Sequence, residues 1–481
     1  MSDFLVGFVM SCRGAFSRRA AFSWFVIVFV ALILRSDWLG VTSLIRTVGV
    51  DPSHYQSLLH FFHAASWNGE RLLSLTIAWM ARHGLMVERS GRIVLIGDET
   101  KTPKEGRRMP NVKTLRQTSE TSSKPSYFRG HEWSVIGVMI GFAGKFFCAP
   151  AWARVSDSCG KANAKDAAEG SRKKKKDVAD AKEDGRTAEI VKEAVQLARR
   201  LMRMAFLVLD AFYATGPVFK EAWNSGGIVV VVTRAKGNCV AHTQPTPPAK
   251  RGRGRPRKYG DAIKIKELYE SEAAMFQEFK AKIYGRTENV RLLPKILHWK
   301  PAGGLVLFVL AETSRGRITV MCSSVSTSPV EALELYCHRS LVEVMFDSLK
   351  NLLGVMKYRF WSAGLEPQTR RPARNTPGRP SENPAATAKT LAAISNFVHI
   401  GMATLVFLQA LACKFGPDVT AEADYWLRTP SCQVPSELIS KIAAGNIIRR
   451  LLCDLGTNPI ATIIRAKRKA LEFPKKMEDA A

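Results

Sequence analysis

Three acidic residues stand where the chain could build a site for phosphoryl chemistry. Asp98 ends the apolar run "RIVLIGD", Asp210 lies within "AFLVLDAFY", and Glu343 lies within the helix-like stretch "YCHRSLVEVMFDSLK" (336–350). A lone acid after a strand is often only a turn residue or a helix cap. Three converging carboxylates repel one another unless a cation joins them, and oxygen ligands suit Mg²⁺ or Mn²⁺. Two such ions, about 3.5–4 Å apart, can activate a nucleophilic oxygen and stabilise the leaving oxygen in phosphodiester displacement.

The stretch 336–350 carries polar residues along one side of its expected helix. At about 100° per residue, four of them fall within about 60° of one another. These four are Tyr336, Arg339, Glu343 and Lys350. The opposite side is apolar and consists of Leu341, Met345, Leu349 and Leu352. An ordinary amphipathic helix with a solvated face shows the same pattern. The two acids that follow strands favour a site, because they supply the other carboxylates.

The elements around the acids alternate between strands and helices. We predict strands at 92–98, 133–142, 144–155, 205–213 and 228–234, and helices at 187–203 and 218–227. This order predicts an α/β fold with a mixed sheet. Asp98 and Asp210 then stand at or near the carboxyl ends of their strands, the edge at which open α/β sheets tend to bind ligands.

We predict five regions along the chain. They are an N-terminal helical DNA-binding domain (1–88), the first part of a catalytic core (89–234), a β-rich insertion (235–328), the second part of the core (329–415) and a C-terminal helical basic region (416–481). Within the insertion we expect a charged helix at about 261–284 and strands at 290–299, 304–311 and 317–323. We also expect a long helix at about 329–353, an apolar helix at 387–414, and charged or Pro-rich loops at 156–186 and 362–386.

The charge of the chain indicates a polyanionic partner. Lys and Arg total 71 against 42 Asp and Glu, a net charge of +29. Such an excess most often means nucleic acid, although a solvated basic surface is the alternative. Residues 250–258, "KRGRGRPRK", concentrate this charge, and their core resembles an AT-hook, which inserts Arg side chains into a narrow minor groove. The predicted DNA contacts there are Arg253, Arg255, Arg257 and Lys258. A flexible loop that touches only phosphates is the alternative.

Other classes of protein are disfavoured. None of the nine cysteines forms a CxxC pair and no HExxH occurs, which argues against a zinc site and a disulfide framework and fits a reducing compartment. The apolar run at 20–34 would span only about 22 Å as a helix, short of the roughly 30 Å membrane core. We therefore expect a buried helix there, and no membrane partner.

The spacing Tyr336–x2–Arg339–x3–Glu343–x6–Lys350, together with Asp98 and Asp210, resembles a known family. It is similar to the Tyr-Arg-Glu-Lys signature of bacterial insertion-sequence DDE transposases, which have a ribonuclease-H-like catalytic domain. The resemblance covers roughly residues 40–415. It implies a β-rich insertion before the glutamate. It also implies that the three acids bind Mg²⁺ (or Mn²⁺), as two ions.

The resemblance also implies roles and partners. Tyr336, Arg339 and Lys350 would contact DNA phosphates, and Trp299 in the insertion could stack on a flipped base, unless it is a core residue. Water would release a 3′-hydroxyl at the element end, and that hydroxyl would attack target DNA. The implied partners are double-stranded DNA, as terminal inverted repeats and target, and a second copy of the chain in a homodimeric synaptic complex. No small-molecule substrate is implied, and the location would be the bacterial cytoplasm, at the nucleoid.

Two alternatives to a cut-and-paste transposase remain. One is a nuclease or resolvase on the same fold, which hydrolyses DNA without joining strands. The other is an inactive, transposase-derived DNA-binding protein. The complete set of Asp98, Asp210, Arg339, Glu343 and Lys350 argues against the inactive protein.

Overall fold

The chain is described here by a computed structural model. It describes residues 1–37, 40–117, 126–156, 172–245, 257–367, 383–424, 433–453 and 458–468, with the backbone alone for 172–184 and 186. The contacts divide the chain into two compact units. The helical unit consists of Met1–Leu85, Thr102–His131 and Asp347–Ala481, and the sheet unit consists of Met86–Lys101 and Glu132–Phe346.

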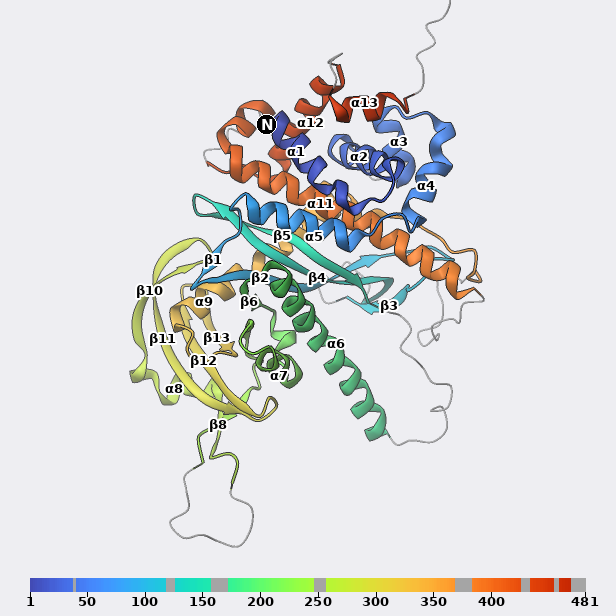
Figure 1. Cartoon of the computed structure of the whole chain (residues 1–481). Coiled ribbons are helices and arrows are strands. Elements are labelled where there is room, and N and C mark those ends of the chain that lie inside the picture. Colours follow the sequence, from blue (N-terminus) through green and yellow to red (C-terminus); the bar gives the residue numbers. More distant parts are fainter. Residues whose placement is uncertain are drawn as a thin grey trace, which may run out of the picture. The chain divides into compact units, whose positions relative to one another are not determined.

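The sheet unit is built on a mixed sheet (Figure 1). Its first five long strands are β2 (Arg92–Pro103), β4 (Tyr127–Phe142), β5 (Lys145–Val155), β6 (Met204–Val208) and β7 (Val229–Arg234). They are ordered β5-β4-β2-β6-β7, with β2, β6 and β7 parallel and β4 antiparallel to β5. The central strands carry continuous apolar runs, as expected of parallel strands that are covered on both faces. A two-residue strand, β1 (Glu88–Arg89), pairs with β2.

Two helices connect the parallel strands. They are α6 (Arg172–Leu201) and α7 (Gly216–Asn224), and α6 packs against α7, β6 and β7. A short 3-10 turn, η3 (Ala211–Tyr213), follows β6. The prediction of a loop at 156–186 was wrong in its second part, because α6 already begins at Arg172. Residues 157–171 lie outside the described residues.

The insertion continues the same sheet. Its strands are β8 (Val240–His242), β9 (Ala262–Lys264), β10 (Gln277–Ile283), β11 (Arg286–Trp299), β12 (Gly304–Thr313) and β13 (Gly316–Cys322). β13 pairs antiparallel with β7, and the order then runs β13-β12-β11-β8-β9. The three strands predicted at 290–299, 304–311 and 317–323 are confirmed as β11, β12 and β13.

The predicted charged helix at 261–284 was wrong. This segment contains β9, the turns η4 (Ile265–Glu267) and η5 (Ala273–Met275), the one-turn helix α8 (Leu268–Ser271), and β10. At its end, "QEFKAKI" alternates between exposed and more buried side chains, a period typical of strands. Pairing of β10 with β11 along its whole length overrides the helical propensity of its Lys, Glu and Ala residues.

The long helix expected at 329–353 is broken in two places. The chain forms α9 (Pro329–Cys337), the 3-10 turn η6 (His338–Ser340) and α10 (Leu341–Asp347). It then widens to the π-helical turn η7 (Ser348–Leu352). Pro329 begins α9 where its missing N–H costs nothing. The breaks mean that a uniform step of 100° per residue does not hold between Tyr336 and Lys350.

The helical unit packs around one long helix, α11 (Pro384–Ala423), which confirms the apolar helix expected at 387–414. α11 contacts α2 (Arg19–Leu34), α4 (Tyr55–His63), α5 (Gly69–Arg82) and α12 (Glu437–Cys453). The other elements are α1 (Ser2–Ser11), η1 (Cys12–Ala15), α3 (Val41–Val48), η2 (Pro52–His54), β3 (Lys113–Arg116), η8 (Val355–Lys357) and α13 (Pro459–Arg465). β3 pairs with the start of β4, at Tyr127–Gly130.

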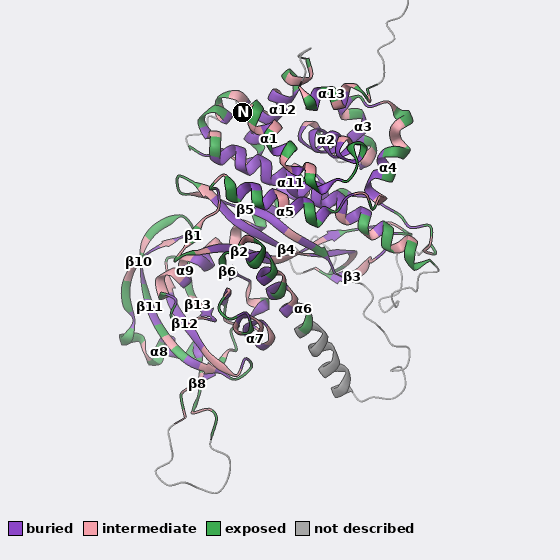
Figure 2. Ribbon diagram, viewed as in Figure 1, coloured by how far each residue is buried: buried purple, intermediate pink, exposed green. Residues whose placement is uncertain are grey.

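Most residues of α2 and many of α11 are buried (Figure 2), and their apolar side chains form the core of this unit. The expectation that the run at 20–34 is a buried helix is confirmed, because most of α2 is buried. Among the described helices, α11 alone is long and apolar enough to cross a membrane, and 78% of its most apolar stretch is buried inside the protein. α11 bends at Phe415, shortly before Pro417. The predicted fold class, a mixed α/β fold with helices at both ends of the chain, is confirmed.

Candidate active site

The structure brings Asp98 and Asp210 to one edge of the sheet. β2 and β6 are parallel neighbours in which Ile96 lies opposite Val208. Asp98 stands two residues further along β2, and Asp210 stands two residues further along the chain, just beyond the end of β6. The expectation that Asp98 stands near the carboxyl end of its strand was wrong, because β2 continues to Pro103. The side chain of Asp98 is 17% exposed and that of Asp210 is 36% exposed. The two acids share one partly buried place, because both contact Arg339.

The guanidinium of Arg339 joins three carboxylates. Its Nη2 lies 2.9 Å from Oδ2 of Asp98, and its Nη1 lies 2.7 Å from Oε1 of Glu343. Its Nε lies 3.7 Å from Oδ1 of Asp210. Arg339 stands in the turn η6, and Glu343 follows one helical turn later in α10. The α9–η6–α10 segment thus supplies both the third acid and the cation that all three acids share.

Burial and charge set the ionisation of this cluster. Burial raises the pKa of the Asp98 carboxyl above its ordinary value, although Arg339 opposes the shift. Burial would lower the pKa of Arg339, but the charges of Asp98, Asp210 and Glu343 outweigh it and raise that pKa. Arg339 is therefore a permanent positive charge that offsets part of the repulsion among the acids.

Two glycines let neighbouring elements approach the strands that carry the site. A Cβ on Gly97, just before Asp98, would lie 2.8 Å from Cδ1 of Ile190 in α6. A Cβ on Gly137 in β4 would lie 2.3 Å from the sulfur of Cys148 in β5. The absence of these side chains lets α6 pack close to β2, and lets Cys148 lie against β4.

A comparison with protein families identifies the family of the chain. A family model described as DDE superfamily endonuclease matches residues 13–291, more than half of the 481 residues. The chain belongs to the DDE superfamily endonuclease family. The matched DDE span contains Asp98 and Asp210 and ends before Glu343. DDE endonucleases generally use divalent metal ions.

A solved transposase structure is distantly similar to this DDE endonuclease. A solved structure described as the cryo-EM structure of the piggyBac transposase synaptic complex with hairpin DNA is similar at 12% identity and a TM-score of 0.36. The similarity covers 96% of this chain and 79% of that chain. No curated protein matches the chain significantly.

The three acids fit a divalent ion by their chemistry, although they do not form a closed set of ligands. Within the described ranges, no three Asp, Glu, His or Cys side chains lie close enough together to hold one metal ion. Instead the carboxylate oxygens of Asp98, Asp210 and Glu343 form ion pairs with one cationic side chain, that of Arg339. Nε of Arg339 is buried and has no hydrogen-bond partner among the described residues. Carboxylate oxygens gathered on a cation are the donor set that Mg²⁺ and Mn²⁺ prefer.

The remaining residues predicted for the DDE site take different places. Tyr336 is only 5% exposed in α9, and burial raises its pKa to about 12. Lys350 lies in η7 and belongs to the helical unit, whereas the three acids belong to the sheet unit. Trp299 is 5% exposed at the end of β11 and packs edge-on against Phe219 at 5.1 Å between ring centres.

The basic segment of the insertion is described only at its end. Arg257 and Lys258 are exposed, and the Nζ of Lys258 lies 5.5 Å from the ring centre of Tyr259. The predicted DNA contacts Arg253 and Arg255 lie outside the described residues. DNA contact by these four residues stays a prediction.

The sequence interpretation missed the partner role of Arg339. It assigned Arg339 to DNA phosphate alone, although the i, i+4 spacing from Arg339 to Glu343 is a known ion-pair signal on a helix. It also missed a basic pocket in the insertion, lined by Lys220, Lys236 and Lys300. These three lysines span 80 positions of the sequence, from Lys220 to Lys300, so no local motif marks them.

Proposed function

We propose that this DDE endonuclease is a metal-dependent, cut-and-paste DNA transposase of the Tyr-Arg-Glu-Lys type. The observation that carries the proposal is the convergence of Asp98, Asp210 and Glu343 on Arg339. The order β5-β4-β2-β6-β7, with Asp98 within β2 and Asp210 just after β6, supports a ribonuclease-H-like core. The net charge of +29 supports a DNA substrate.

In this proposal the three carboxylates hold the catalytic ions. Asp98, Asp210 and Glu343 would bind two divalent ions, either Mg²⁺ or Mn²⁺. When bound, such ions supply a lowered pKa for the attacking water and charge stabilisation at the leaving oxygen. Arg339 balances the charge of the acids and, with the guanidinium fork that suits phosphate, positions the scissile phosphodiester. The partial burial of Asp98 limits competing water around the reacting phosphate.

The proposed reaction has two phosphoryl transfers. In the first, the oxygen of water bonds to the phosphorus at the element end, and the P–O3′ bond breaks to leave a 3′-hydroxyl. In the second, that hydroxyl oxygen bonds to a phosphorus of target DNA, and one target P–O bond breaks. The first step hydrolyses one phosphodiester to a 3′-hydroxyl and a 5′-phosphate, and the second exchanges one phosphodiester for another and leaves a 3′-hydroxyl on the target strand. Neither step needs an external energy source. The partners are terminal inverted repeats and target DNA, and synapsis of two ends calls for a homodimer. The host location is the bacterial nucleoid.

A strand-transfer assay tests the proposal. The genomic sequence that flanks the reading frame supplies the inverted repeats, which are end-labelled and incubated with the protein, target plasmid and Mg²⁺. The variant Asp210→Asn removes one carboxylate charge at the site, and Asp261→Asn removes one from an exposed loop as a matched control. We expect joined products with the wild type and Asp261→Asn, and none with Asp210→Asn.

Each other outcome selects another function. Metal-dependent cleavage without joining would show a nuclease or resolvase. DNA binding without cleavage would show an inactive transposase-derived binding protein. Joined products that survive in Asp210→Asn would refute the assignment of the site.

A further inference from the structure

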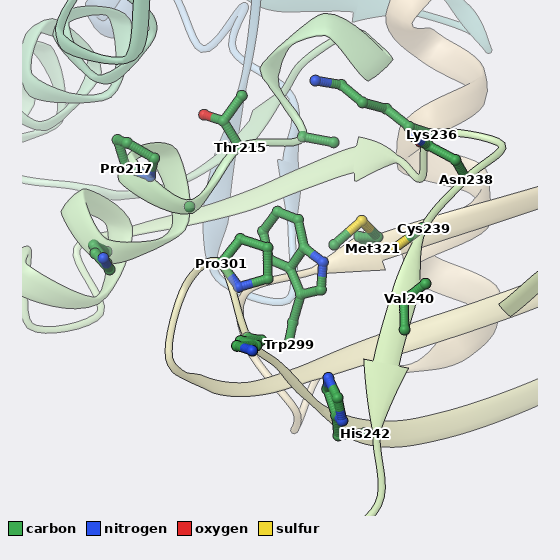
Figure 3. A pocket seen from close by; sticks show the side chains of 14 residues that line it. Thr215, Pro217, Lys236, Asn238, Cys239, Val240, His242, Trp299, Pro301 and Met321 are labelled. Atoms are coloured by element: carbon green, nitrogen blue, oxygen red, sulfur yellow. The ribbon is translucent and has the colours of Figure 1, made fainter. Parts of the chain in front are cut away.

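The insertion and α7 enclose a basic pocket in the sheet unit. It has a volume of about 820 Å³ and is lined by the start of α7, the segment before β8, and the turn after β11. Figure 3 shows Trp299 and Pro301 between Thr215 on one side and the strand that carries Cys239, Val240 and His242 on the other. Sites of this size bind ligands the size of one or two nucleotide units.

The charge of the lining has one sign. Three lysines line the pocket, Lys220, Lys236 and Lys300, together with His242, and the lining contains no Asp or Glu. The three lysines are exposed, and none forms an ion pair with a residue in the described part of the chain. Clefts lined by one sign of charge focus the electrostatic potential, so this pocket attracts anions.

The floor of the pocket is largely apolar. Trp299 packs edge-on against Phe219, and its side chain lowers the pKa of the Cys239 thiol by less than burial raises it. Burial raises the pKa of Cys239 to about 11, so that the thiol stays neutral. A neutral floor beneath three ammonium groups favours a ligand whose anionic part lies at the rim.

The pocket adjoins the described end of the basic segment. The ring centre of His242 lies 5.5 Å from that of Tyr259. The Nζ of Lys258 also lies 5.5 Å from the centre of the Tyr259 ring. Positive charge therefore continues from Lys236 and Lys300 past His242 to Lys258. A single small anion would contact only some of these groups, whereas the successive phosphates of a nucleic-acid strand can contact several of them.

From this arrangement we infer that the pocket lined by Lys220, Lys236 and Lys300 binds the phosphodiester backbone of a DNA strand. The inference rests on the proposed function and adds a DNA contact outside the carboxylate cluster. Phosphate is the shared chemistry of DNA and of small phosphorylated compounds, so the experiment must separate these two sources.

Lysine footprinting with mass spectrometry tests the inference on the intact wild-type chain. The protein is acetylated with a lysine-reactive ester in EDTA, alone, with inverted-repeat DNA, or with inorganic pyrophosphate. Lys192 and Lys280 serve as internal controls, because both are exposed in the same unit and outside the pocket. We expect DNA to reduce acetylation of the three pocket lysines severalfold more than that of the controls, and millimolar pyrophosphate to have little effect.

A charge variant measures the contribution to affinity. The variant Lys220→Gln/Lys236→Gln/Lys300→Gln is compared with Lys192→Gln/Lys264→Gln/Lys280→Gln, which removes the same charge elsewhere in the sheet unit. Each phosphate contact contributes about 0.7–0.9 to the slope of log affinity against log salt concentration, so three lost contacts reduce the slope by about 2.1–2.7. We expect this reduction in the pocket variant and less than half of it in the control.

The outcomes separate the inference from the proposed function. If DNA binds and the pocket lysines stay as reactive as the controls, the pocket is not a DNA contact, and the proposed function stands. If DNA does not bind at all, both fail. Protection by pyrophosphate without protection by DNA would also overturn the inference and assign the pocket to a small phosphorylated ligand.

Discussion

Nη2 of Arg339 lies 2.9 Å from Oδ2 of Asp98, a residue 241 positions earlier in the chain. The same guanidinium also reaches Glu343 at 2.7 Å and Asp210 at 3.7 Å. Arg339 thus acts as an internal counter-ion at the place where the three carboxylates meet. A divalent cation bound by these carboxylates would compete with Arg339 for the same oxygens, and this competition would give the site measurable properties apart from catalysis.

Replacement of Arg339 should tighten metal binding. In Arg339→Ala, the three carboxylates lose their positively charged partner. The positive charge of the guanidinium, which repels an incoming metal ion, is removed as well. A nearby unit charge contributes a few kcal/mol at an effective dielectric of about 20, and we expect Mn²⁺ to bind at least about tenfold more tightly. Isothermal titration calorimetry without DNA measures the affinity for Mn²⁺. The affinity of Arg339→Lys should fall between those of the wild type and Arg339→Ala.

A distant arginine provides the control for that measurement. Arg291 pairs with Glu312 on the insertion, at 2.8 Å, and Arg291→Ala removes the same charge there. Its affinity for Mn²⁺ should equal that of the wild type. Weaker binding in Arg339→Ala than in Arg291→Ala would contradict the counter-ion role.

Asp98→Asn should separate activity from stability. Burial raises the pKa of Asp98, so the native state pays for the ionised carboxylate at neutral pH, and a neutral amide removes this cost. We expect DNA cleavage to fall about 100-fold or more, while the free energy of unfolding in EDTA stays equal or rises by on the order of 1 kcal/mol. Urea denaturation and the cleavage assay give the two numbers. Loss of activity together with severe loss of stability would point to a structural role, and Glu278→Gln serves as the surface control.

Gly97→Ala should shift Asp98 through packing. The new Cβ would lie 2.8 Å from Ile190 and 2.9 Å from Leu209, so one of these side chains must move. Overpacking of this kind costs about 1–3 kcal/mol, and cleavage should fall with it. Gly185→Ala in α6 is the matched control, since a Cβ there meets no atom of the described residues within 4 Å and should stabilise the helix by about 0.5–1 kcal/mol. Equal stability of the two variants would exclude the close approach at Gly97.

The helical unit should gain stability between about pH 7 and pH 10. Lys104 is 5% exposed, donates hydrogen bonds to the carbonyls of Met356 and Tyr358, and lies over the Tyr358 ring. Burial lowers its pKa to about 7. Above pH 7 the unfolded chain still holds this proton while the native state has lost it, so stability rises until the lysine of the unfolded chain titrates near 10.5. The full effect is on the order of 5 kcal/mol.

The variant Lys104→Met isolates this effect. It should flatten the rise of the urea midpoint between pH 7 and pH 10, whereas Lys389→Met, on the exposed side of α11, should leave the rise intact. A rise that persists unchanged in Lys104→Met would show that Lys104 is charged in the native state throughout this range.

Local patterns in the sequence determined the strands and acids of the sheet unit. The apolar runs before Asp98 and Asp210 predicted β2 and β6 because a buried strand must be apolar on both faces. The net charge of +29 indicated a polyanion whatever the fold. The Tyr336-to-Lys350 spacing marked Arg339 and Glu343 as site residues. These signals are readable because each depends on residues that are near one another in the chain.

Only the tertiary structure decided which distant residues meet. Pairing with β11 made a strand of 277–283, where the local charge pattern favoured a helix. Pairing of β13 with β7 joined the insertion to the core sheet. Convergence of three acids on Arg339, and of three lysines on one pocket, depends on contacts between elements that lie far apart in sequence. Hydrogen-bond ladders and ion pairs of this kind form only after the chain has folded, so no periodicity within one segment encodes them.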